Sequence, residues 1–257
     1  QSLLIDQGYG QGLACGDFDQ DGFPDVMVAN IGSVNLYVNQ GDGTFALAYE
    51  LPLAPQNDWA AACALADVDR DGLPDIYVAT YLAQSDYETR KCPRNGGKHY
   101  GCAPQNFPAA KDMLFKNQDA YQWSDAFDKL VAGSVDPGRS LNVTVGDLDQ
   151  EPGNEIYIAN DTSANDLFVN RLDDNGNVTL IQQAGIAGVA FNDNGRPQGS
   201  MGVAVADLDR NGLEDLFVTN AIGENNALYL QRNPNVFSES SKAWKLFHSS
   251  IDMVAFG

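Results

Sequence analysis

Residues 17–25 read DFDQDGFPD and are followed directly by the apolar run VMVAN at 26–30. Carboxylates stand at positions 1, 3, 5 and 9 of this nine-residue loop, and the glycine at position 6 permits a sharp turn. Oxygen ligands at alternating positions of a tight turn suit a hard cation, above all Ca²⁺. The loop therefore predicts a calcium site that leads straight into a β-strand.

The same loop recurs three times in the chain. It reads DVDRDGLPD at 67–75, DLDQEPGNE at 147–155 and DLDRNGLED at 207–215. The four copies start 50, 80 and 60 residues apart. These periods are typical of propeller blades or similar β-units and not of helical solenoids. A repeat, and not an isolated metal loop, therefore organises the chain.

Each loop is embedded in the same succession of strand-like segments. Small residues precede it and an apolar run follows it. The next segment combines leucine with an aromatic residue: LYVN at 36–39, LFKN at 114–117, LFVN at 167–170 and LYLQ at 228–231. In the first repeat, a GDG turn at 41–43 and TFAL at 44–47 complete the unit. The unit is a four-stranded antiparallel meander, the blade of an all-β propeller. We expect Trp59, Trp123 and Trp244 in the core between blades.

The whole chain, 1–257, is predicted to be one propeller region. The repeats lie near 10–55, 58–130, 140–185 and 198–245, and residues 250–257 resemble the first strand of a fifth repeat. The chain begins at Gln1 without a signal-peptide segment, which fits a trimmed chain as well as a fragment. We expect part of a longer propeller of about seven or eight blades, and a closed ring of four is the alternative.

The second repeat contains an insertion at 81–111, expected to project from one face and to offer a surface to a partner. Cys92 and Cys102 lie ten residues apart in this irregular segment, which predicts a disulfide and an oxidising compartment. A zinc site with His99 is the alternative, although the spacing matches no standard zinc arrangement. Cys15 and Cys63 occupy first strands of successive repeats. They are expected to be buried free thiols, and a disulfide between them is the alternative.

Composition excludes several classes of function. The chain has 35 acidic and 15 basic residues, a net charge of −20, which disfavours nucleic acid and anionic membrane partners. The hydrophobic content of 44% argues for a packed protein, and no stretch is long and apolar enough to insert into a membrane. Fifteen of the acids stand at the ligand positions of the four loops. The acidity is therefore local, and bound calcium would offset it.

No catalytic motif is present, and no catalytic residue is predicted. The chain has two histidines, His99 and His248, and lacks a nucleophile elbow and a phosphate loop. A carboxylate pair outside the loops remains open as a glycosidase site, without support from a motif. An EF-hand is excluded because position 12 of each loop lies inside a strand, where an EF-hand has a bidentate glutamate.

These loops, the Gly-Asp or Ala-Asp before them and the strands after them resemble the FG-GAP/VCBS repeat proteins, which include the integrin α-subunit propeller. The Leu-aromatic-x-Asn segments, GDGTF at 41–45, and the insertion KC…YGCAP leading to DMLF at 112–115 are similar to the branch often joined to an ASPIC/UnbV domain, which includes cartilage acidic protein. The resemblance covers nearly the whole chain. It implies one Ca²⁺ in each loop on one face of the propeller.

The resemblance also implies which atoms coordinate: side chains at positions 1, 3, 5 and 9 and the carbonyl at position 7. The expected ligands are Asp17, Asp19, Asp21, the Phe23 carbonyl and Asp25; Asp67, Asp69, Asp71, the Leu73 carbonyl and Asp75; Asp147, Asp149, Glu151, the Gly153 carbonyl and Glu155; and Asp207, Asp209, Asn211, the Leu213 carbonyl and Asp215. In the third loop Pro152 occupies the glycine position, so the turn would shift to Gly153. Three to four ions are expected, because the sequence does not decide whether the third loop binds calcium.

Three functions remain in competition. The first is a calcium-binding propeller that is secreted, periplasmic or on the cell surface and acts as an adhesion, scaffold or protein-interaction module. The second is a carbohydrate-binding propeller, which an exposed tryptophan in a groove would favour. The third is an enzyme or biosynthetic accessory protein of the UnbV type, which a cleft with carboxylates away from the loops would favour. Fold alone does not decide among them.

Overall fold

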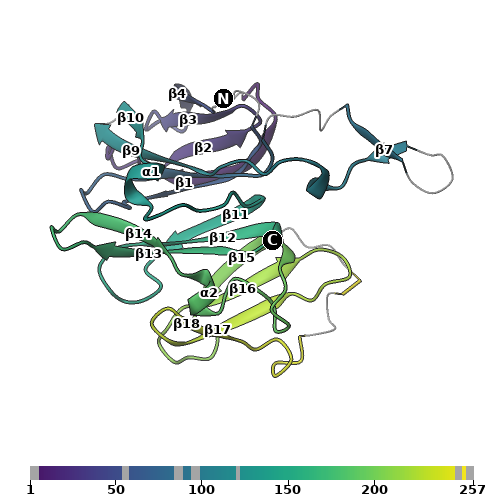
Figure 1. Cartoon of the computed structure of the whole chain (residues 1–257). Coiled ribbons are helices and arrows are strands. Elements are labelled where there is room, and N and C mark those ends of the chain that lie inside the picture. The colour runs from purple at the N-terminus through teal and green to yellow at the C-terminus, as the bar shows by residue number, and fades with distance from the viewer. Residues whose placement is uncertain are drawn as a thin grey trace.

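The computed structural model describes residues 6–53, 58–83, 89–93, 99–119, 122–246 and 251–252. This part of the chain is all-β, and its strands form four consecutive four-stranded antiparallel units that stack side by side as propeller blades (Figure 1). The predicted fold class is confirmed. Most of the expected fifth repeat, and His248, lie outside the described residues.

Each blade takes its four strands from one stretch of the chain, which in blade 2 is interrupted by the two strands of the insertion. Blade 1 contains β1 (Gly10–Gly16), β2 (Asp25–Asn30), β3 (Ser33–Asn39) and β4 (Phe45–Pro52); blade 2 contains β5 (Ala60–Ala66), β6 (Asp75–Thr80), β9 (Met113–Asp119) and β10 (Gln122–Asp125). Blade 3 contains β11 (Ser140–Gly146), β12 (Glu155–Ser163), β13 (Asp166–Leu172) and β14 (Val178–Gln182); blade 4 contains β15 (Gln198–Ala206), β16 (Asp215–Asn220), β17 (Ala227–Asn233) and β18 (Val236–Glu239). Two short helices, α1 (Phe127–Leu130) and α2 (Ala184–Ala187), follow β10 and β14. The end of β12 also pairs with β15, which joins blades 3 and 4 into one sheet.

Three hydrophobic clusters fill the three interfaces between consecutive blades. The second strand of an inner blade is buried on both faces: Ile76 of β6 packs toward blade 1, and the adjacent Tyr77 packs toward blade 3. This two-sided burial explains why these strands are continuous apolar runs and do not alternate with polar residues. Small residues let the first strands of blades 1 and 2 approach closely, since a Cβ on Gly12 of β1 would lie 2.5 Å from the carbonyl oxygen of Ala61 in β5.

The three tryptophans occupy different environments. Trp123 packs against the cluster between blades 1 and 2, with its ring 6.4 Å from that of Phe18. Trp59 lines a cavity at the axis, and Trp244 is 44% exposed beside blade 4. The expectation of inter-blade packing therefore holds for Trp123 alone, because Trp59 precedes its first strand and Trp244 follows the last strand of its blade.

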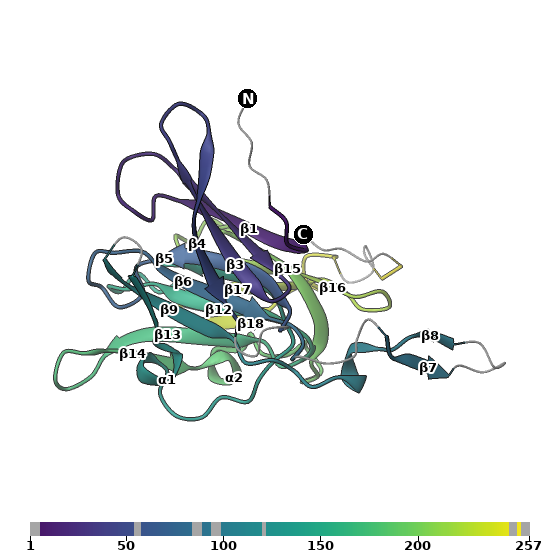
Figure 2. The same ribbon diagram turned by 90° about the horizontal axis from the view of Figure 1, so that it is seen from above.

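The insertion projects from the body of the molecule (Figures 1 and 2). Within it, β7 (Lys91–Pro93) pairs with β8 (His99–Gly101), and a 3₁₀ helix, η1 (Pro104–Asn106), follows. Cys92 and Cys102 form the predicted disulfide, which removes both thiols from the zinc alternative. Cys63 is a buried free thiol as expected, whereas Cys15 is free but exposed. No helix among the described residues has the length and apolar character needed to cross a membrane.

Candidate metal centre

The four Asp-rich loops share one backbone conformation. Position 4 has a positive φ near 60° although it is never glycine: Gln20, Arg70, Gln150 and Arg210 have φ of 60, 64, 64 and 61°. Position 6 has φ of 93, 90 and 87° in Gly22, Gly72 and Gly212. A non-glycine residue in the left-handed region costs about 1 kcal/mol or more, which a contact of the side chain at position 4 can offset.

Carboxylates at positions 1 and 5 hold the turn. Asp17 accepts hydrogen bonds from the backbone N–H groups of Asp21 at 3.0 Å and Gly22 at 2.9 Å. Asp21 in turn accepts one from the N–H of Phe23 at 2.8 Å. The second and fourth loops repeat these bonds, with Asn211 taking the part of Asp21. The acids thus build the turn that gathers them, as Asx turns do elsewhere.

The carboxylate at position 9 is buried and fastens the loop to the third strand. Asp25 accepts the N–H of Phe18 at 3.1 Å with one oxygen and the N–H of Asn39 at 2.9 Å with the other. Asp75, Glu155 and Asp215 make the equivalent pair of bonds. Burial raises the pKa of Asp75 to about 6 and that of Glu155 to about 7, and acids of the same loop add to the effect.

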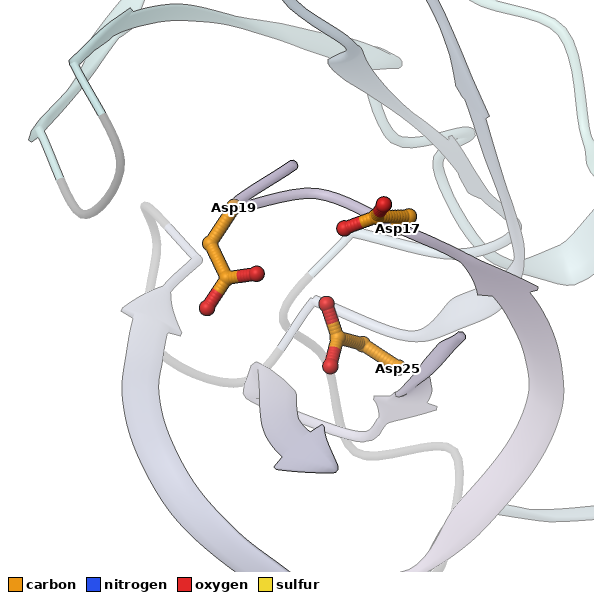
Figure 3. A group of neighbouring side chains, drawn as sticks. All are labelled: Asp17, Asp19 and Asp25. Atoms are coloured by element: carbon orange, nitrogen blue, oxygen red, sulfur yellow. The ribbon is translucent and has the colours of Figure 1, made fainter. Parts of the chain in front are cut away.

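In every loop three carboxylates converge. One oxygen from each lies within 4.8 Å of the others in Asp17, Asp19 and Asp25; in Asp67, Asp69 and Asp71; in Asp147, Asp149 and Glu155; and in Asp207, Asp209 and Asp215. Figure 3 shows the three carboxylates of the first loop directed toward a common space. Asp21, Asp75 and Glu151 are not members of these groups. The complete ligand sets, including the four carbonyls at position 7, stay predictions.

The residues present fit a hard cation. An all-oxygen donor set suits Ca²⁺. In addition, the Oδ1 atoms of Asp69 and Asp209 are buried and have no hydrogen-bond partner among the described residues. A buried carboxylate oxygen without a partner is costly, and a cation within the loop would satisfy it.

In the third loop Pro152 occupies position 6, and the glycine with a positive φ stands at position 7 instead. Gly153 at position 7 has φ of 117°, as the sequence predicts. A Cβ on Gly153 would lie 2.5 Å from Nη2 of Arg70 and 2.7 Å from Cγ of Asn170. Glycine is therefore needed here both for its backbone conformation and for the close approach of the second loop. The longer side chain of Glu155 reaches the position-9 contacts that aspartate makes elsewhere.

Basic side chains contact the acids of three loops, which the sequence analysis missed. Lys116 forms ion pairs with Asp69 and Asp71, the second at 2.9 Å. Arg171 pairs with Asp149 at 2.7 Å, and Arg232 pairs with Asp209 at 2.8 Å. All three basic residues adjoin the amide that ends the Leu-aromatic-x-Asn/Gln segment. Their position beside that amide was the available signal. They reduce repulsion among the acids and compete with a bound cation.

Side chains also link each of the first three loops to the next blade. Gln20 donates to the carbonyl of Gly72 at 2.6 Å, Arg70 donates to Asn170 at 2.8 Å, and Gln150 donates to the carbonyl of Gly212. In the reverse direction, amides of the later blade donate to position-2 carbonyls of the earlier loop: Asn117 to Phe18, Asn170 to Val68 and Gln231 to Leu148. In the first three loops these bonds offset part of the cost of the positive φ at position 4. They also explain the recurring amide at the end of the third strand.

Comparison with known proteins agrees with the repeat assignment. Residues 17–78 match the model of a family described as FG-GAP-like repeat. A comparison with curated protein sequences gives no match. Among solved structures, the chain is similar to an Agrocybe aegerita lectin that recognises non-reducing terminal N-acetylglucosamine, with 16% identity, a TM-score of 0.44, and coverage of 88% of this chain and 50% of the lectin. It is also similar to the exotype rhamnogalacturonan lyase YesX, with 14% identity, a TM-score of 0.38, and coverage of 89% and 48%. The chain thus spans about half the length of these structures.

Proposed function

We propose that the protein is a calcium-stabilised propeller module that recognises an extracellular partner and does not catalyse a reaction. The observation that carries the calcium proposal is the convergence of three carboxylates in each of four loops. Two of these loops contain a buried oxygen that finds no hydrogen-bond partner in the part of the chain that the structure describes. Three to four Ca²⁺ ions would fix the loops that link neighbouring blades. The disulfide supports an oxidising location, and the insertion sequence supports the ASPIC/UnbV-associated branch.

The insertion is the surface that we propose for a protein partner. The insertion, residues 81–111, contains two acids, Asp86 and Glu88, and five basic residues, Arg90, Lys91, Arg94, Lys98 and Lys111, in a chain whose net charge is −20. Arg90 is anchored by a 2.7 Å hydrogen bond to the carbonyl of Asn106 and by the ring of Phe107, whereas Lys91 is exposed. A basic projection on an acidic body would orient an acidic partner toward this segment during encounter.

Carbohydrate binding is the second candidate, and the position of Trp59 favours it. Trp59 lines a cavity beside the base of the insertion, together with Tyr81 and several polar residues. The two candidates use the same end of the molecule.

A calcium titration by calorimetry tests the first part of the proposal. Three or four sites are expected, and a chain that takes up no calcium contradicts it.

Arrays of extracellular proteins and of glycans, probed in calcium, test recognition. A variant in which Arg90–Cys102 is replaced by a short Gly-Ser linker should lose protein partners and keep its thermal midpoint. Absence of binding on both arrays would contradict a recognition role.

A further inference from the structure

The first strand of every blade contains a β-bulge at the same register. The pairing shifts between Gly10 and Gly12, Ala60 and Ala62, Ser140 and Asn142, and Ser200 and Val203. One residue of each bulge lines a common cavity of about 820 Å³: Gln11, Ala61, Leu141 and Met201. Bulges redirect side chains beside functional sites, and four in register gather residues from all four blades. The volume is within the usual range for small-molecule sites.

This cavity lies at the end of the axis opposite the Asp-rich loops. Each first strand begins at the cavity and ends at its loop, so six residues of extended chain, about 20 Å, separate Gln11 from Asp17. The 3₁₀ helix at the base of the insertion contributes Pro104 and Gln105 to the wall. The cavity is therefore separate from the candidate metal centre and adjoins the projecting hairpin.

Two aromatic side chains form a fixed corner in the wall. Trp59 and Tyr81 are perpendicular, with an interplanar angle of 87° and centroids 5.4 Å apart. The indole N–H of Trp59 donates to Gln11 of blade 1 at 3.1 Å, and the hydroxyl of Tyr81 donates to Asp161 of blade 3 at 2.6 Å. Bonds to both neighbouring blades thus hold the two rings in place, so little conformational entropy remains to be lost on binding.

Asp161 gives the cavity a buried acceptor. Asp161 is one of the residues that line the cavity, although it is only 6% exposed. Its Oδ2 accepts the Tyr81 hydroxyl, and its Oδ1 accepts no hydrogen bond from the described residues. A carboxylate can only accept, so the complementary ligand atom is a hydroxyl or N–H donor. Burial and the bond to Asp161 raise the pKa of Tyr81, which keeps it a donor at neutral pH.

The other lining groups define the chemistry of the ligand. Gln105, Asn142 and Thr162 offer neutral donors and acceptors, and Leu141 and Met201 are apolar. No Lys, Arg or His among the described residues lines the cavity, so an anionic ligand would face Asp161 without a counter-charge. The perpendicular rings leave no parallel slot for a flat base. A neutral ring with an apolar face and hydroxyl groups at its edge matches all of these features.

We propose that this axial cavity binds a neutral hexopyranose unit of a glycan, with one sugar face against Trp59 and a hydroxyl group donating to Asp161. The inference deepens the proposed recognition function and rests on it. The base of the insertion flanks the site, so the rest of the glycan chain would leave the cavity alongside the hairpin.

The test is titration of the full chain with neutral trisaccharides built from glucose, mannose and galactose, up to about 10 mM, followed by calorimetry and tryptophan fluorescence. Trigalacturonate, adenosine and trialanine are the comparison probes. At least one neutral trisaccharide is expected to bind. Trp59→Leu and Asp161→Asn should each weaken binding at least about tenfold, while Trp244→Leu, on the outside of blade 4, should leave it unchanged.

Three results would overturn the inference: no neutral trisaccharide binds, only a comparison probe binds, or binding is the same in both cavity variants. If Trp59→Leu lowers the thermal midpoint, its loss of binding is not informative. The trisaccharide affinities of Asp161→Asn and Gln105→Ala then decide the assignment, because neither substitution removes a core side chain. Calcium titration of the same samples separates the two proposals. Normal calcium binding without sugar binding rejects the cavity assignment alone, and sugar binding without calcium binding rejects the metal assignment alone.

Discussion

Asp25 illustrates how one carboxylate can serve structure and metal binding together. Both of its oxygens accept backbone N–H groups, from the loop at Phe18 and from the third strand at Asn39. One of these oxygens also belongs to the converging group of the first loop. Asp21, in contrast, accepts a single local N–H and has a natural asparagine, Asn211, as its counterpart in the fourth loop.

A pair of substitutions separates these contributions. In a chelator, Asp25→Asn should lower the free energy of unfolding by about 1–3 kcal/mol, because an amide NH₂ would face a buried N–H donor. Asp21→Asn should change it by less than about 0.5 kcal/mol, since Asn211 makes the same turn. Both variants should bind calcium more weakly. Urea unfolding measures the stability, and equal losses in the two variants would contradict the structural role of position 9.

Lys116 is expected to weaken the second metal site. Its ammonium group contacts Asp69 and Asp71, which a cation in this loop would also need. Lys116→Met should therefore tighten one calcium site, roughly threefold to tenfold, by removing a competing charge. Lys111→Met is the matched control, because Lys111 pairs with the exposed Asp128 away from the loops. Calorimetric affinities that are identical for both variants and the parent would reject the competition.

Asp112 should make stability depend on pH. Burial raises its pKa to about 7 from an ordinary 3.8, and Asp166 adds to the shift, despite hydrogen bonds from Thr80, Tyr77 and Ser140. The folded state therefore holds this proton more tightly than the unfolded chain. The corresponding stability is complete below about pH 4, declines as the pH rises toward 7, and is lost above it.

Asp112→Asn removes this titration. Asparagine is already the acceptor at the equivalent positions Asn165 and Asn226, so the fold should tolerate it. In saturating calcium, the parent should lose about 2 kcal/mol more stability than the variant between pH 5 and pH 8. Unfolding curves across this range measure the difference. Parallel pH profiles would show that Asp112 does not titrate as described.

At the scale of the element, the third loop depends on its neighbour. Gly153→Ala should destabilise the protein by about 2–4 kcal/mol, because it combines an unfavourable φ with collision against Arg70 and Asn170. Gly212 also has a positive φ, 87° against 117° for Gly153, but no atom of the described residues lies within 4 Å of its new Cβ, so Gly212→Ala should cost only about 1 kcal/mol. Thermal unfolding of the two variants compares them. Equal costs would mean that inter-loop contact contributes nothing.

Repeated features were predictable from the sequence, and contacts between repeats were not. Asp loops in phase with apolar strands predicted four blades, and Pro152 followed by Gly153 predicted the shifted turn. The pattern could not show that Gln20 reaches the Gly72 carbonyl, because this bond joins residues 52 positions apart. It also misplaced Trp59, since an aromatic residue before a first strand suits the core and the axis equally. Sequence periodicity reports on each blade, whereas the cavity exists only where blades meet.

At the scale of the whole molecule, the loops form a connected series. Hydrogen bonds link the first loop to the second, the second to blade 3 and the third to the fourth. The same loops concentrate 15 of the 35 acids at their ligand positions. Repulsion among the acids of one loop therefore also strains the hydrogen bonds to the next blade. We expect calcium to stabilise the propeller as a unit.

Chelation should reveal this coupling. Each site contributes about 2.7 kcal/mol when free calcium is 100 times its Kd, so three or four sites together contribute about 8–11 kcal/mol. Calorimetric scans with and without a chelator should differ by roughly 10 °C or more and keep a single transition. Mg²⁺ should restore less stability than Ca²⁺, because it requires a smaller octahedral shell and retains its waters. An unchanged midpoint would refute the metal assignment. Separate transitions for individual blades would be consistent with the metal assignment but would refute the coupling between blades. The hydrogen bonds between loops would then be too weak to transmit the loss of one ion.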